Sequence, residues 1–201
     1  DGDKLAYSVD ADGREICTLR IKDLQTGEHL PESLTNTFGD VYGHGGVVWA
    51  GDGKSLFYVT LDASQRPYRV HRHVLGTDPA QDALLYEEKD DTYFLWLTQS
   101  RSKAYVLVFL LSTTTHECLF MPNDGATTEF KVFQPRIKGM EYQVEHVGDK
   151  FYVITNDNAQ NFKLMQTPLD KTTKDNWQEV IPHRADTLLT GADAFDDFLV
   201  L

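Results

Sequence analysis

The stretch GDGKSLFYVT, residues 51–60, decides the fold, because its pattern recurs along the chain. A lysine follows turn residues and precedes an apolar strand at Lys4, Lys54, Lys103 and Lys150, with Asp197 in the fifth place. The successive intervals are 50, 49, 47 and 47 residues. A period of this length, divided into short strands, is that of one four-stranded propeller blade and is too long for a helical-pair repeat. We therefore predict an all-β chain, an incomplete β-propeller of about four blades.

Turn signals divide the chain into three complete repeats between two partial ones, and no stretch shows a helical period. The predicted blades are residues 1–38 (partial), 47–88, 93–133, 140–180 and the start of a fifth at 185–201. The first lacks its innermost strand and ends in a weak strand before Asn36, whereas the fifth opens near Leu188 and stops in its second strand. Because the chain starts without methionine and stops inside an apolar run, we expect an excised fragment.

Composition limits the classes of partner. The 201 residues are 41% apolar, enough to bury a core, and carry a formal charge of −12. This charge repels nucleic acid and anionic lipid and favours cationic partners, so we expect neither nucleic-acid nor membrane binding. The longest apolar run, residues 105–111, is far shorter than the roughly 20 residues that span a bilayer, and no basic-then-apolar leader opens the chain.

The chain has two cysteines, Cys17 and Cys118, which lie on different repeats. Two such residues are too few for a disulfide framework or a zinc site. We therefore expect a reducing compartment, the cytoplasm, and neither a metal nor another cofactor.

Antiparallel blade geometry brings two kinds of loop to one end of the ring: those from strand two to strand three and those from strand four to the next blade. This face is predicted to carry Asp10, Asp12, Asp40, Asp62, Asp90, Asp91 and Asp157. These acids could attract a basic peptide. The alternative is that they are ordinary turn formers, for which aspartate is a common choice.

Motifs that carry chemistry are weak here. There is no G-x-S-x-G elbow, no phosphate-cradling or dinucleotide loop and no calcium loop. His44 and the two glycines after it resemble an oxyanion loop faintly, but a turn before a strand explains them better. His71 and His73 share one strand face and could ligate a metal, although a polar face is the simpler interpretation. The acidic run 87–91 is interpreted as a solvated turn. The residues alone thus predict a binding or gating module without catalysis of its own.

Several segments resemble the propeller of the oligopeptidase B (protease II) group in the prolyl oligopeptidase family. The most specific is RPYRVHRHVLGT at residues 66–77, followed by YEE at 86–88. TN at 155–156 with NFKL at 161–164, IPHR at 181–184 and the opening YSVD at 7–10 are also similar. The resemblance covers essentially the whole chain. It implies a two-domain cytosolic serine peptidase that cuts short peptides after Lys or Arg.

In that family a seven-bladed propeller covers an α/β-hydrolase domain, which holds the catalytic triad, so the resemblance implies no catalytic residue in this chain. It implies instead that the rim of the second repeat lies near substrate or the hydrolase domain. Phe57 would supply apolar contact, Asp62 a charge for substrate or for an interdomain salt bridge, and Arg66 belongs to the same rim. For Phe57, packing between blades is an equally good explanation.

Two functions remain open. The chain is either the substrate-gating part of an oligopeptidase B-like enzyme, acting with the hydrolase domain of its parent on short basic peptides, or a stand-alone propeller for protein interaction. Downstream sequence distinguishes them, because only the first requires a later G-x-S-x-G followed by Asp and His. Since about four blades cannot close a ring, we also expect self-association through open strand edges.

Overall fold

The structure is a computed structural model that describes residues 2–39, 46–195 and 197–201. Strands and turns dominate it, and the helices are two single turns, η1 (Pro79–Gln81) and η2 (Lys174–Asn176). The all-β prediction is confirmed. No helix within the described ranges has the length and apolar character needed to cross a membrane.

The first sheet has seven antiparallel strands and contains the first two repeats. Its order is β1-β2-β3-β5-β6-β7, and β4 pairs with β5 beside this path. A single residue pair, Thr37 with Thr60, joins β3 to β5. The strands are β1 (Lys4–Val9), β2 (Ile16–Asp23), β3 (His29–Phe38), β4 (Val47–Trp49), β5 (Ser55–Leu61), β6 (Pro67–Val74) and β7 (Ala83–Glu87).

Two four-stranded sheets and a short hairpin follow along the chain. The order β11-β10-β9-β8 is formed by β8 (Phe94–Gln99), β9 (Tyr105–Leu111), β10 (His116–Pro122) and β11 (Lys131–Gln134). The order β12-β13-β14-β15 is formed by β12 (Tyr142–Val147), β13 (Lys150–Thr155), β14 (Lys163–Pro168) and β15 (Gln178–Ile181). The hairpin pairs β16 (Asp193–Ala194) with β17 (Leu199–Val200).

These strands match the sequence pattern closely, with two differences. The weak strand expected before Asn36 is the ten-residue β3, which runs on past Asn36 to Phe38. Its pairing with β2 contains register shifts, and Asn36 has a positive φ of 57°. Near Leu188, where a fifth repeat is predicted to open, there is no strand in the described residues, and the next strand is β16 at Asp193. The grouping of strands into blades remains our proposal.

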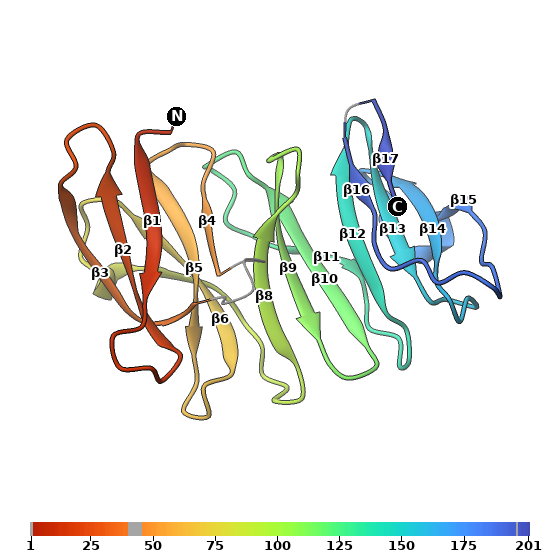
Figure 1. Ribbon diagram of the computed structural model, residues 1–201, viewed down its shortest axis with the longest axis horizontal. Coiled ribbons are helices and arrows are strands. Elements are labelled where there is room, and N and C mark those ends of the chain that lie inside the picture. Colours follow the sequence, from red (N-terminus) through yellow and green to blue (C-terminus); the bar gives the residue numbers. More distant parts are fainter. Residues whose placement is uncertain (1, 40–45, 196) are drawn as a thin grey trace. The chain divides into compact units, whose positions relative to one another are not determined.

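The chain forms two compact units. Unit 1 is Asp1–Thr98 with Asn123–Glu129, and unit 2 is Gln99–Pro122 with Phe130–Leu201. In unit 1 the loops 10–15, 62–66 and 88–93 lie at one end, the lower end in Figure 1. Its core contains Leu19, Ile21, Leu34, Leu56 and Tyr58.

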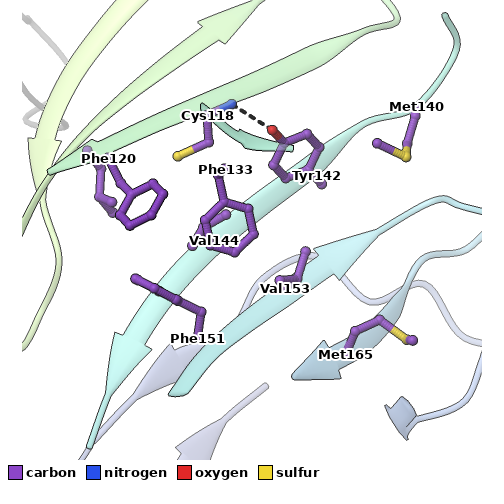
Figure 2. Close-up of a cluster of buried hydrophobic side chains, with 10 residues drawn as sticks. Cys118, Phe120, Phe133, Met140, Tyr142, Val144, Phe151, Val153 and Met165 are labelled. Carbon is purple, nitrogen blue, oxygen red and sulfur yellow. Dashed lines mark hydrogen bonds between the residues drawn. The ribbon is translucent and has the colours of Figure 1, made fainter. Parts of the chain in front are cut away.

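The core of unit 2 is rich in aromatic rings (Figure 2). Phe133 meets Phe151 edge to face with centroids 5.1 Å apart, a favourable geometry for two rings. Tyr142 is fully buried, and its hydroxyl accepts from the Cys118 N–H at 2.8 Å and donates to the Gln134 carbonyl at 2.7 Å. One phenol thus hydrogen-bonds two buried backbone groups on the neighbouring strands β10 and β11.

Removing this hydroxyl should be costly. We expect Tyr142→Phe to lower the free energy of unfolding by about 1–3 kcal/mol, because the Cys118 N–H and the Gln134 carbonyl would both stay buried without it. Urea unfolding followed by circular dichroism measures this. Tyr152→Phe, on the half-exposed face of β13, is the control and should change little. Equal effects of the two substitutions would contradict the role given to the hydroxyl.

Candidate functional site

The three residues predicted at the rim lie on β5 and on the loop that leads into β6. Phe57 is only 1% exposed and faces neighbours in the first sheet, with Val48 and Arg72 as its strand partners. It lies within the packed sheet, whereas Asp62 and Arg66 lie in the loop 62–66 at the end of unit 1. The structure therefore brings two of the three together, and a substrate or interdomain role for any of them stays a prediction.

Arg66 joins two loops of unit 1. Its guanidinium pairs with the Asp62 carboxylate at 3.0 Å through Nε. Nη1 donates to the carbonyls of Tyr93 at 2.9 Å and Asp90 at 3.1 Å, and Nη2 donates to that of Glu88 at 3.3 Å. Arg66 is 8% exposed, and the N–H groups of its guanidinium donate to these acceptors instead of to water or a ligand. We call this arrangement the Arg66 clasp, formed by Asp62, Arg66 and the three carbonyls.

Asp62 organises its own loop as well. Its carboxylate accepts from the Ser64 N–H at 2.8 Å, the Ser64 hydroxyl at 2.7 Å and the Arg66 N–H at 3.0 Å. Burial alone would raise the pKa of the Asp62 carboxyl, but the hydrogen bonds from Ser64 and Arg66 outweigh it and lower the pKa from 3.8 to about 2. Asp62 is therefore ionised at neutral pH and serves as the fixed anion of the clasp.

A pocket of about 390 Å³ opens beside the clasp. It is mostly apolar, with Ser64, Gln65 and Glu15 as polar residues, and is lined by Glu15, Phe38, Gly39, Leu61, Ser64, Gln65, Pro67, Phe94 and Trp96. Phe38 and Trp96 meet edge to face with centroids 6.0 Å apart. We call it the aromatic pocket. No sequence signal pointed to this pocket, because its walls come from four separate segments of unit 1.

Two of the pocket residues have strained backbones. Glu15 has φ 61° and Gln65 has φ 65°, values in the left-handed region that side chains disfavour. Each turn is held by an aspartate: the Glu15 N–H donates to Asp10 at 2.8 Å, and the Gln65 turn is closed by Asp62. Sites that store such strain must be fixed by their surroundings, as here.

Most of the acids predicted to line one face are used inside their own loops. Asp10 accepts from four consecutive backbone N–H groups, Asp12 pairs with Arg14, and Asp90 accepts from Thr92. Asp157 differs, because it pairs with Lys174 of η2. Asp40 lies outside the described residues. The turn-former interpretation is therefore favoured for this set.

The other sequence candidates have structural partners. His71 stacks on Tyr58 and contacts Thr60, while His73 is fully buried with Nδ1 2.8 Å from Asp82. The polar-face interpretation is therefore wrong for His73. Among the described residues no group of three or more His, Cys, Asp or Glu side chains could hold a metal. His44 lies outside those residues.

The acidic run 87–91 is only partly solvated. Glu88 is 4% exposed and accepts from the Asp90 N–H at 2.8 Å and the Tyr86 hydroxyl at 3.0 Å. The solvated-turn interpretation is thus wrong for Glu88, whose carboxylate caps the loop that Arg66 holds. The two cysteines are free and buried, and burial raises the pKa of both thiols.

A serine–histidine contact in unit 2 also escaped sequence analysis. Ser102 Oγ lies 2.7 Å from His146 Nδ1, and Tyr105 and Phe151 pack against the imidazole. Burial lowers the pKa of His146, and its Nε2 is buried with no hydrogen-bond partner in the structure. A nucleophilic serine needs a base oriented by a third group, and no described residue supplies one to His146 Nε2. The 44-residue separation gave no sequence signal.

The clasp makes a pH-dependent prediction. Because the pKa of Asp62 is lowered on folding, its stabilisation is complete above pH 3.8 and is lost as the pH falls toward 2. We expect Asp62→Asn to cost about 2 kcal/mol at pH 7 and about half of that at pH 3. Urea unfolding at both pH values measures it, with the exposed Asp91→Asn as control. A loss of equal size at both pH values would contradict the assignment.

Comparison with known proteins agrees with this architecture. The family described as "Prolyl oligopeptidase, N-terminal beta-propeller domain" matches residues 1–201. The chain is 39% identical to dipeptidyl aminopeptidase BI of Pseudoxanthomonas mexicana over 98% of its length, and 36% identical to protease 2 of Moraxella lacunata over 96%. It spans 27% and 29% of the length of these relatives.

A solved structure agrees as well. Oligopeptidase B from Leishmania major superposes with a TM-score of 0.90 at 27% identity, over 98% of this chain and 27% of the other. Strand order, repeat length and the whole-chain family match all point the same way, so the propeller fold class and the resemblance seen in the sequence are confirmed. The chain belongs to the N-terminal β-propeller domain family of the prolyl oligopeptidases.

Proposed function

We propose that this chain is the substrate-gating propeller part of an oligopeptidase B-like serine peptidase that cuts short peptides after Lys or Arg. The observation that carries the proposal is the family match over all 201 residues, combined with peptidase relatives more than three times as long. Hydrolysis then belongs to an α/β-hydrolase domain of the parent chain. The propeller restricts which peptides reach it, since a narrow entrance excludes folded proteins.

The excess of acidic over basic residues supports a preference for basic peptides. A net charge of −12 raises the local concentration of cations through the long-range field, even where individual carboxylates are engaged in turns. The two free cysteines fit a reducing compartment, and we place the parent enzyme in the cytoplasm on that ground.

A second candidate is the removal of dipeptides from free N-termini. The 39% identity to a protein named dipeptidyl aminopeptidase favours it, being slightly above the 36% identity to protease 2. The two candidates share the gating role of the propeller and differ in the peptide end that the parent enzyme reads. A stand-alone propeller remains the alternative if downstream sequence holds no G-x-S-x-G followed by Asp and His.

Activity assays distinguish these functions. We expect the parent enzyme to hydrolyse N-terminally blocked Arg and Lys amides, and the isolated 201-residue chain to hydrolyse none above background. Substrates with a free N-terminal dipeptide test the second candidate in parallel. A fluorophosphonate probe should label a serine of the parent and none of this chain. Turnover that scales with the concentration of purified chain, together with such labelling, would overturn the assignment.

We also propose that the isolated chain self-associates. The side chains of Val200 in β17 and of Leu201 after it are 49% and 57% exposed. Among the described residues, β17 pairs with β16 in a two-stranded sheet. An apolar edge strand of this kind pairs readily with another chain. Light scattering should show the average mass rising with concentration, and Val200→Lys should reduce the rise. Leu24→Lys, at a 52% exposed loop position, is the control. A strictly constant monomer mass would contradict the proposal.

A further inference from the structure

We propose that the aromatic pocket of unit 1 binds an apolar side chain of a basic peptide, while Glu15 pairs with a neighbouring Lys or Arg of that peptide. This rests on the proposed function, because it gives the gated substrate a contact point on the propeller itself. The pocket volume of about 390 Å³ lies within the range of small-ligand sites and accepts a single large side chain.

The aromatic walls are not required for the core. Along β8 the side chains alternate: Leu95 and Leu97 are fully buried on one face, whereas Phe94 is 51% exposed on the other, which also carries Trp96. Phe94 and Trp96 both line the pocket. One exposed ring, Phe94, and two partly buried rings, Phe38 and Trp96, thus gather in a hollow with polar residues around them, which is typical of a recognition site.

The rim is rigid before any ligand arrives. Asp10 fixes the turn that presents Glu15, and the Arg66 clasp fixes the turn that presents Ser64 and Gln65. Both turns hold a non-glycine residue in the left-handed region. Binding to such a surface orders few protein groups, so less affinity is lost to conformational entropy. On this view Asp62 and Arg66 are positioning residues for the pocket.

The charge at the rim selects the occupant. Asp12 is neutralised by Arg14, and Asp10 is surrounded by the N–H groups of its own turn. Glu15 is exposed, and its carboxylate has no hydrogen bond or ion pair within the part of the chain that the structure describes. A free carboxylate beside an apolar hollow, on a chain of charge −12, complements a cation next to an apolar side chain. It disfavours an acidic peptide.

Binding to the 201-residue chain tests the proposal directly. The probe is a fluorescein-labelled Gly-Arg-Phe-Arg-Gly peptide, compared with versions that carry Ala in place of Phe or Glu in place of Arg. Fluorescence anisotropy should show binding of the first peptide, about tenfold weaker binding of the Ala version from loss of the buried ring, and none of the Glu version. Affinity should fall from low to physiological salt, where the Debye length is about 8 Å.

Matched variants locate the site. Phe94→Ser should weaken binding about tenfold, whereas Leu84→Ser, at a 48% exposed position on β7, should not. Glu15→Gln should weaken it about threefold at low salt and have no effect at high salt, and Glu28→Gln is its control. Circular dichroism confirms that each variant is folded.

Absence of binding, or a folded Phe94→Ser variant that binds normally, would overturn the proposal. So would a Phe94→Ser variant that alters self-association and leaves peptide binding unchanged, because the pocket would then serve a second copy of the chain. Each of these failures leaves the proposed function standing, since that is judged by hydrolysis in the parent enzyme. Conversely, if the parent enzyme does not cut after Arg or Lys, the proposed function fails, and any measured affinity of the pocket for the peptide then needs another explanation than gating.

Discussion

The rest of the structure depends on one constraint: the apolar strands that follow Lys54, Lys103 and Lys150 must be covered on both faces. In β5 the residues from Ser55 to Val59 are all buried, although successive side chains point to opposite faces of the sheet. β9 and β13 show the same loss of alternation. A sheet whose middle strand is apolar on both sides cannot face water on either. Layered sheets of the propeller kind satisfy this demand, and the outer strands can then be half polar.

The turn before β5 shows how the repeat motif meets that constraint. Asp52 accepts from the N–H groups of Lys54 and Ser55, which starts the strand. A Cβ on Gly51 would overlap the carbonyl oxygen of Asn123, so glycine is required by the close approach of the segment 123–129. A Cβ on Gly125 would lie 2.5 Å from that of Asp52. Both ends of this contact within unit 1 therefore depend on the absence of a side chain.

The sequence predicted what is periodic and local. Most strands were located correctly because the repeat interval and the apolar runs that follow each mark are local signals that agree with one another. It could not predict contacts that the fold brings together from a distance. Arg66 reaches carbonyls 22 to 27 residues away, and Ser102 meets His146 across 44 residues. Phe57 was chosen at the rim, yet its burial follows from neighbours that no single motif reveals. For His73 and Glu88 the sequence pattern predicts exposure to solvent, because ionisable residues usually lie at the surface.

The way the loops use their carboxylates distinguishes two effects of an acidic sequence, the long-range electrostatic field and direct contact with a ligand. Asp10, Asp52, Asp62 and Asp124 each accept backbone N–H groups of their own turn, which builds the loop and leaves few oxygen positions for a ligand. Such charges still contribute to the long-range field, which depends on net charge and not on free lone pairs. Contact recognition requires something else, a carboxylate that its own loop does not use. Steering and recognition therefore fall to different residues, and specificity has to be sought in acids whose carboxylates accept no hydrogen bond from their own turn, such as Glu15.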